Sequence, residues 1–314
     1  MLNRRHIRIK VLQALYAYFQ SEKDDLVKGE KELLFSLNKV EELYIYLFDL
    51  MAEIHFLAER KIEEGKRRRV ATDLDLNPNT KFVDNKLLKV IRNSKALSAK
   101  RSEFKLSWDN ENDIVRAMFK QLTEADFYQE YLADPIKSFD QDRDLVIKMF
   151  KQVIVNSESI QYHIEEKSIY WIDDLDLVSS MIIKTMKKWT ADEDEFVAIL
   201  PLYRDKEDVV FAKSLYRNVI SESDKLDKLI KEKTKNWELE RIALMDMLVM
   251  KLAIIEAKEF KNIPTKVTMN EFIEIAKFYS TPKSKSFING ILDNLFSELK
   301  ASGEITKIGR GLME

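Results

Sequence analysis

The sequence contains no cysteine, and it has only six glycines and five prolines among its 314 residues. Without thiols the chain can form no disulfide, has no cysteine nucleophile and cannot hold a metal through cysteine, so a reducing compartment, the cytoplasm, is expected. The scarcity of glycine and proline favours long helices over sheets that need many turns. We therefore expect an all-α fold.

Long apolar runs and catalytic motifs are missing as well. No stretch offers eighteen uncharged apolar residues, and the start MLNRRHIRIK has no apolar signal core, so neither a membrane span nor export is predicted. The histidines, His6, His55 and His163, lie far apart, and no glycine-rich phosphate loop or G-x-S-x-G motif occurs. We predict no enzymatic activity, no metal and no cofactor. The net charge of −2 restricts any nucleic-acid surface to a local patch.

Two groups of acidic residues invite a metal-site interpretation. The loop from Asp73 to Asp84 begins like a calcium loop, but Pro78 stands where the turn needs glycine and Lys81 replaces an oxygen ligand. The carboxylates in residues 173–176 would suit an acid/base couple or Mg²⁺, yet no histidine or phosphate loop is near. Stabilisation of the N-terminus of the next helix explains them better.

The first twenty residues combine cations with an apolar stripe. Leu12, Leu15 and Phe19 recur at helical spacing, so a helix is predicted to begin near Arg4. Basic side chains at a helix N-terminus oppose the helix dipole by roughly 0.3–1 kcal/mol each, and an external anion would reverse this penalty. The alternative is a frayed basic start that faces water. The basic residues of these turns are Arg4, Arg5, His6, Arg8 and Lys10.

The long middle region is predicted to be a series of helices. The first is a bundle helix over residues 30–64 that ends at Gly65, and the cations of residues 66–69 follow it. These cations either complement the helix C-terminus, which we favour, or bind phosphate. An acidic run at residues 191–195 is expected to form a turn and a cap. The other helices of this region are expected over residues 82–99, 113–131, 142–164 and 173–189.

The C-terminal third is organised around an apolar stretch, residues 242–255, in which only Asp246 and Lys251 are charged. It should form the buried spine of a bundle. Thr268 and Glu271 have the spacing of a capping box, and Gly290 lies within an apolar helical stripe, which suggests close approach of another helix. Further helices are expected over residues 206–233, 268–279 and 287–299, and a frayed tail over 300–314.

Aromatic residues flank a second basic loop near the C-terminus. Lys283 and Lys285 lie between Tyr279 and Phe287. Cations beside aromatic rings suit single-stranded RNA, because phosphates attract positive charge and unstacked bases need a π-face. The alternative is that both aromatic residues belong to the core, as their helical spacing permits.

Four segments together resemble the transcription antitermination factor NusB family. They read RRHIRIKVLQALYAYFQ, WELERIALMDMLVMKLAIIEA, IPTKVTMNEFIEIAKFYS and KSFINGILDNL. The resemblance covers roughly residues 3–20 and 209–299. It implies a pair of small helical bundles, here enlarged by inserted helices, that binds boxA-type RNA together with a small-subunit ribosomal protein, NusE, in antitermination and ribosomal RNA synthesis.

The resemblance also implies roles for single residues. Arg4, Arg5 and Arg8 match the family's basic RNA-binding start, and His6 stands where another arginine is common. Glu240 and Asp246 fall where the family presents acidic groups to the ribosomal partner. Lys283 and Lys285 replace a more acidic loop. The complete set of expected RNA-binding residues is Arg4, Arg5, His6, Arg8, Lys10, Tyr16, Tyr279, Lys283, Lys285 and Phe287.

Two alternative functions are also considered. The expected organisation of the chain is one elongated body. A protein-interaction scaffold would use the inserted helices and no RNA. An RNA cytosine methyltransferase would need a catalytic cysteine and a nucleotide-binding α/β domain, which the sequence does not provide. The expected parts are a basic first helix (1–20), an enlarged helical insertion (21–208), a C-terminal bundle (209–299) and the tail (300–314).

Overall fold

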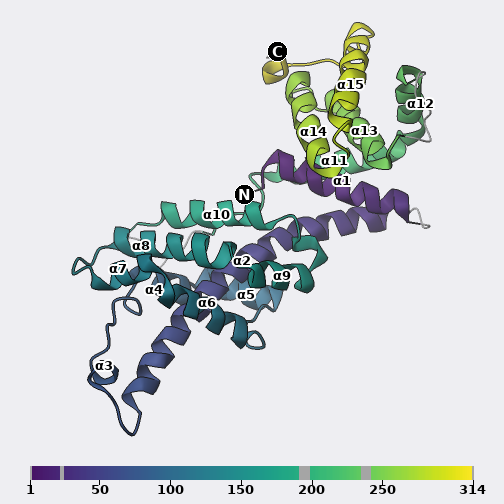
Figure 1. Ribbon diagram of the computed structural model, residues 1–314. Helices are drawn as coiled ribbons and strands as arrows, with labels where there is room; N and C mark the ends of the chain where they lie inside the picture. Colours follow the sequence, from purple (N-terminus) through teal and green to yellow (C-terminus); the bar gives the residue numbers. More distant parts are fainter. Residues whose placement is uncertain (1, 22–24, 191–198, 235–241, 313–314) are drawn as a thin grey trace. The chain divides into compact units, whose positions relative to one another are not determined.

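The computed structural model describes residues 2–21, 25–190, 199–234 and 242–312 (Figure 1). All regular secondary structure in these ranges is helical, which confirms the expected all-α fold. The residues group into two compact units. We call residues 38–202 the middle unit, and residues 2–37 together with 203–314 the terminal unit. The predicted single elongated body stays a prediction.

The middle unit contains most of the inserted region. Helix α2 (Leu26–Lys66) gives its first residues to the terminal unit and the remainder to the middle unit. None of the described helices is long and apolar enough to cross a membrane. The other helices of the middle unit are α3 (Asp73–Leu76), α4 (Lys86–Asn93), α5 (Lys95–Phe104), α6 (Asn112–Glu124), α7 (Asp126–Ala133), α8 (Phe139–Lys148), the π-helix η1 (Met149–Val155), α9 (Glu158–Lys167), the 3₁₀-helix η2 (Ile169–Trp171) and α10 (Leu175–Lys188).

An aromatic cluster forms part of this unit's core. The fully buried ring of Tyr46 stacks on Trp108 with 4.1 Å between ring centroids, and the Trp108 indole donates a hydrogen bond of 3.0 Å to the Tyr46 carbonyl. The Tyr46 hydroxyl lies 2.8 Å from His163 Nε2. His163 is therefore a half-buried histidine that packs against this aromatic cluster.

Single residues interrupt several helices that the sequence predicted to be continuous. Ser94 ends α4 through its backbone N–H and begins α5 by accepting a hydrogen bond from Leu97 N at 3.2 Å. Ala125 separates α6 from α7, and Glu222 separates α11 (Lys206–Ser221) from α12 (Ser223–Lys233). Side-chain capping by serine competes with helix continuation, and hydrophobic periodicity does not report it.

The terminal unit is built around α13 (Leu244–Glu259). Every residue from Leu248 to Ala257 is buried, which confirms the expected spine from Leu248 onward, whereas Ala243 precedes the helix and is exposed. Helix α13 packs against α1, α11, α12, α14 and α15 (Figure 1). These helices are α1 (Arg4–Gln20), α11 (Lys206–Ser221), α12 (Ser223–Lys233), α14 (Thr265–Tyr279) and α15 (Ser284–Ala301), followed by the short 3₁₀-helix η4 (Gly309–Leu312).

The sequence predictions for Thr268 and Gly290 are wrong. Helix α14 begins at Thr265 after Pro264, so Thr268 lies inside the first turn, where it is fully buried. Its hydroxyl donates a hydrogen bond of 2.8 Å to Glu256 and caps nothing. Gly290 faces open space, because no described atom beyond its chain neighbours and its own helical backbone lies within 4 Å of the position that a Cβ would take.

The tail after α15 packs against the link between α13 and α14. Ile305 is buried, and the Ile308 N–H donates a hydrogen bond of 3.1 Å to the Lys261 carbonyl. The ammonium group of Lys307 donates a hydrogen bond of 3.1 Å to the Phe260 carbonyl. A Cβ on Gly311 would overlap the Lys261 carbonyl oxygen. The described part of the tail is thus held by hydrogen bonds and close packing, and the expected fraying is wrong there.

We predict that Gly290→Ala increases the free energy of unfolding by about 0.5–1 kcal/mol, because alanine restricts the unfolded chain and meets no neighbour in the helix. Gly311→Ala is the matched comparison and should lower stability. Urea unfolding followed by far-ultraviolet circular dichroism measures both. Destabilisation by Gly290→Ala would contradict the open surroundings of this glycine.

Candidate nucleic-acid interface

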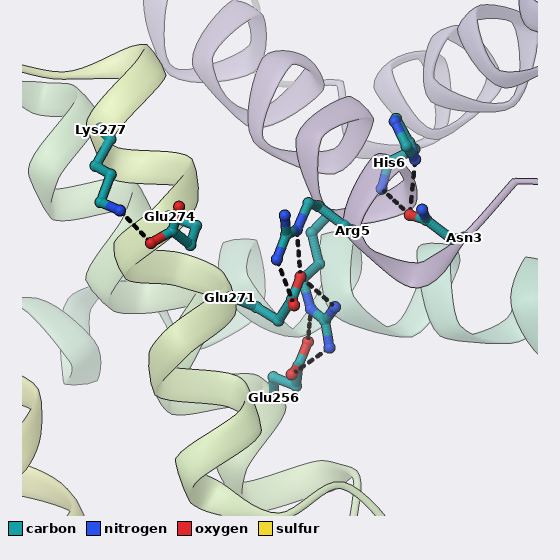
Figure 2. A network of polar contacts seen from close by, with 8 residues as sticks. Asn3, Arg5, His6, Glu256, Glu271, Glu274 and Lys277 are labelled. Atoms are coloured by element: carbon teal, nitrogen blue, oxygen red, sulfur yellow. Dashed lines mark hydrogen bonds and ion pairs between the residues drawn. The ribbon is translucent and has the colours of Figure 1, made fainter. Parts of the chain in front are cut away.

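The first helix starts with an amide cap. The Asn3 Oδ1 atom accepts a hydrogen bond of 3.0 Å from the backbone N–H of His6, and it lies 2.7 Å from His6 Nδ1 (Figure 2). The first turn of α1 contains no acidic residue. The Asn3 side chain therefore supplies the N-terminal cap of a helix whose first turn contains basic residues and no acidic one.

Arg8 is buried and paired with a carboxylate of the spine. Its Nε atom lies 2.6 Å from Glu256 Oε2, and its Nη2 atom lies 2.8 Å from Glu256 Oε1. The two side chains are 4% and 0% exposed. Thr268 adds the third hydrogen bond to the carboxylate. This pair joins α1 to α13 and α14, and it turns Arg8 away from solvent.

Arg5 forms a second two-pronged pair at the surface. Its Nε and Nη2 atoms lie 2.8 Å and 2.7 Å from the two carboxylate oxygens of Glu271 (Figure 2). The Arg5 side chain is 46% exposed, and Arg8 Nη1 also lies 3.5 Å from Glu271. The hydrogen bonds from Arg5 hold the pKa of Glu271 below its ordinary value, with smaller contributions from both positive charges.

Arg4 is oriented by an aromatic ring and a carboxylate. Its guanidinium carbon lies 4.4 Å from the centroid of the Phe211 ring. Its Nε atom lies 3.4 Å from Asp208 Oδ1, and Nη2 lies 4.0 Å from Glu207. About a third of the side chain, 34%, stays exposed. Arg4 can therefore meet a ligand while it keeps these contacts.

His6 and Lys10 do not add exposed positive charge. Burial, followed by the nearby charges of Arg5 and Lys10, lowers the pKa of His6 to about 4. The imidazole is therefore neutral at pH 7 and can only donate or accept hydrogen bonds. Lys10 is 3% exposed. The basic start of α1 is thus less accessible than its sequence suggests.

The acidic residue of the spine is also buried. Asp246 is 6% exposed, and its carboxylate accepts hydrogen bonds from Ser280 and, at 2.8 Å, from Ser284. These serines begin and end the link between α14 and α15, so Asp246 holds this link against α13. Glu240, the other acidic residue expected at the partner surface, lies outside the described residues.

The remaining expected RNA-binding residues lie on two parts of the terminal unit. Tyr16 is 41% exposed on α1. Lys283 and Lys285 are exposed at the start of α15, whereas Tyr279 and Phe287 are half-buried. Both aromatic residues take part in interactions with the rest of the protein. Only part of each ring is therefore available to a base.

Glu274 on α14 is influenced by positive charge from three helices, α1, α14 and α15. It is paired with Lys277 (Figure 2), and the hydrogen bond from this lysine is the main reason that the pKa of Glu274 is lowered. The charges of Arg5 and Lys285 lower that pKa further. Cations of α1 and α15 thus lie close enough to Glu274 to influence its pKa.

The sequence did not reveal the roles of three residues of the terminal unit, Glu256, Glu271 and Phe278. Glu256 and Glu271 neutralise much of the positive charge of α1. Phe278, beside Lys277 on α14, is 82% exposed. Phe278 falls outside the apolar stripe of its helix, and this position in the sequence could have predicted an exposed aromatic residue. Glu256 directly follows the apolar run, and this position could have predicted a buried carboxylate that needs a partner.

The other candidate sites lie in the middle unit. Lys66 pairs with Glu63 at 3.0 Å, and Arg68 pairs with Asp75 at 3.1 Å. Within the described ranges, no group of three or more His, Asp or Glu side chains could hold a metal ion. The acidic run at residues 191–195 lies outside the described residues.

Comparison with known proteins identifies the family. A model described as the NusB family matches residues 175–297. A transcription antitermination protein NusB from Salinibacter ruber (strain DSM 13855 / M31) is 39% identical over 114 residues, which make up 36% of this chain and 71% of that protein. The chain belongs to the NusB family.

Two further NusB proteins show a similar match. The protein from Chloroherpeton thalassium (strain ATCC 35110 / GB-78) is 43% identical over 104 residues, 33% of this chain and 49% of the relative. The protein from Geotalea daltonii (strain DSM 22248 / JCM 15807 / FRC-32) is 44% identical over 89 residues, 28% of this chain and 61% of the relative. No solved structure matches the chain significantly. Most of the middle unit, up to residue 174, lies outside the family match.

Glu256→Gln should lower the local stability of α13 by about 3–5 kcal/mol, because the buried Arg8 would lose its closest counter-charge. Arg5→Ala removes a partly exposed pair and should cost about 1 kcal/mol or less. Native-state hydrogen exchange of α13 amides measures both changes. Similar small effects of the two variants would contradict the structural role of the buried pair.

The low pKa of His6 predicts a pH-dependent contribution to stability. In the unfolded chain the imidazole has its ordinary pKa of 6.5, so it takes up a proton at a higher pH than in the folded protein, where the pKa is about 4. The folded protein therefore loses no stability through His6 above about pH 6.5, and it is increasingly destabilised as the pH falls towards 4, because only the unfolded chain takes up the proton in this range. Unfolding of His6→Gln should depend less on pH across this window. Identical pH dependence of wild type and variant would contradict the burial of His6.

Proposed function

We propose that this protein is an RNA-binding transcription antitermination factor that binds boxA-type single-stranded RNA together with the small-subunit ribosomal protein NusE, in ribosomal RNA synthesis. Membership of the NusB family supports this proposal. The observation that carries it is the pair of partly exposed guanidinium groups, Arg4 and Arg5, held at the N-terminus of α1.

Both arginines are arranged to receive phosphate. Arg5 uses two of its five N–H donors on Glu271, so the others remain for a phosphate oxygen. The positive end of the α1 dipole favours an anion at the same place. Because Glu271, Glu207 and Asp208 partly neutralise these cations, we expect weak binding to RNA alone and tighter binding when the ribosomal protein adds its own contacts.

The face of α14 next to these arginines offers surfaces for bases. Phe278 exposes most of its ring, and Lys283 and Lys285 are exposed nearby in sequence. Unstacked bases stack on aromatic side chains, and lysines attract the connecting phosphates. We propose that Tyr16, Tyr279 and Phe287 extend this surface through the exposed parts of their rings.

The buried members of the expected set have a positioning role in this proposal. Arg8 fixes α1 through Glu256, and Lys10 is nearly inaccessible. Asp246 holds the α14–α15 link, so any effect of this residue on the ribosomal partner would act through that link. His6 contributes hydrogen bonds without charge at neutral pH. Glu240 stays a proposed contact with the partner.

A second candidate is a scaffold function of the middle unit. Most of this unit lies outside the family match. Its helices therefore offer surfaces that the family's RNA-binding role does not require. In this alternative the chain brings another protein to the transcription complex.

Fluorescence anisotropy with a labelled boxA-like RNA tests the RNA-binding function. Arg4→Ala/Arg5→Ala should weaken binding about tenfold at low salt and reduce the salt dependence of the affinity, because two phosphate contacts are lost. Lys225→Ala/Lys228→Ala removes the same charge from exposed positions of α12 and is the matched control.

Addition of the purified ribosomal protein should raise the RNA affinity of the wild type. Arg4→Ala/Arg5→Ala should still bind RNA about tenfold more weakly than the wild type when the ribosomal protein is present. If both double variants bind RNA as tightly as the wild type, α1 does not bind RNA. If neither RNA nor the ribosomal protein binds the wild type, the scaffold function gains support.

A further inference from the structure

A pocket of about 520 Å³ opens beside Arg4 in the terminal unit. Its walls come from the first turn of α1, the start of α11, and the link between α13 and α14. We call it the Arg4 pocket. It lies next to a proposed phosphate contact, but none of the RNA-binding residues expected from the sequence lines it except Arg4.

One part of the wall is apolar and uncovered. Val210 is 60% exposed although it lines a concave surface, and Phe260 and Ile263 are half-buried beside it. The Phe260 ring meets Phe211 edge to face with 4.6 Å between centroids, and the Arg4 guanidinium covers Phe211. The pocket thus offers aliphatic and aromatic surface next to the flat face of a guanidinium, which is also a stacking surface for bases.

The rim of the pocket carries two lysines as well as the exposed carboxylates of Glu207 and Glu259. Lys206 and Lys261 are both exposed, and neither forms an ion pair within the described part of the chain. Glu207, in contrast, lies 4.0 Å from Arg4. The two lysines are therefore available to an anion at the edge of an apolar cavity.

The tail holds the wall of the pocket in place. The Lys261 carbonyl accepts a hydrogen bond from Ile308, and the Phe260 carbonyl accepts one from Lys307. Gly311 packs so closely on Lys261 that no side chain fits between them. A wall that is fixed before the ligand arrives loses little conformational entropy on binding.

We propose that the Arg4 pocket binds one nucleotide of the RNA strand, with the base against Val210, Phe260 and the Arg4 guanidinium and the adjoining phosphates on Lys206 and Lys261. The proposal rests on the proposed RNA-binding function and extends it to a base-binding site outside the expected RNA surface. A nucleotide fits because it joins an apolar ring to negative charge, and both halves of the pocket would be used. An acidic peptide would also meet the lysines, but it has no flat ring to place against the guanidinium.

The test measures binding of a fluorescein-labelled, single-stranded boxA-like RNA of about twelve nucleotides to the full chain, since an RNA of this length can reach both sites. Lys206→Ala/Lys261→Ala should bind about fivefold more weakly than Lys225→Ala/Lys228→Ala, which has the same net charge. Val210→Ser keeps every charge and should weaken binding about threefold through the lost apolar contact. All changed side chains are exposed, and circular dichroism verifies that each variant is folded.

Inorganic polyphosphate, used as a competitor, separates base binding from attraction to phosphate. Polyphosphate should bind the wild type and Val210→Ser equally tightly, because it has no base that could contact Val210. An RNA affinity of Lys206→Ala/Lys261→Ala equal to that of the control, or an unchanged affinity of Val210→Ser, would overturn the proposal.

The experiments distinguish an error in the pocket proposal from an error in the proposed RNA-binding function. Arg5 does not line the pocket, so Arg5→Ala tests only the phosphate contact of α1. If Arg5→Ala weakens binding while the pocket variants match their control, the pocket proposal alone is wrong. If the wild type does not bind RNA, the proposed function itself is wrong.

Discussion

The buried ion pair between Arg8 and Glu256 is the interaction on which the terminal unit depends. A guanidinium and a carboxylate that are almost fully removed from water destabilise a protein unless each finds its partner in good geometry. Here the pair has two hydrogen bonds, and Thr268 adds a third to the carboxylate. Since these residues belong to α1, α13 and α14, only one rotation of α1 satisfies them.

That rotation decides which cations of α1 reach the surface. Arg4 and Arg5 lie one helical turn before Arg8, so they emerge at the edge of the packed face, where Phe211 and Glu271 hold them. The same logic applies at the other end of the spine. Asp246 binds two serines and fixes the link that precedes the exposed lysines of α15. Buried charges therefore position the exposed ones.

Hydrophobic periodicity predicted the helices but not their polar partners. The apolar run of residues 242–255 specified a buried spine, because a helix that is apolar on all sides has no solvent face. Arg8 and Glu256 are 248 residues apart, and no local pattern links them. Thr268 and Glu271 had the spacing of a capping box, yet long-range hydrogen bonds to Glu256 and Arg5 use both side chains. The packing of Gly311 against Lys261 likewise depends on a contact that spacing does not encode.

The central claim is that α1 presents Arg4 and Arg5 to RNA while Arg8 stays bound to Glu256. Side-chain ¹⁵N NMR of the arginine Nε–H groups tests it most directly, in a titration of the full chain with boxA-like RNA. We expect the Arg4 and Arg5 signals to shift with RNA concentration, and the Arg8 signal to keep its position and its protection from solvent exchange. A shift of Arg8 as large as that of Arg5, or unchanged Arg4 and Arg5 signals in the presence of bound RNA, would contradict the account.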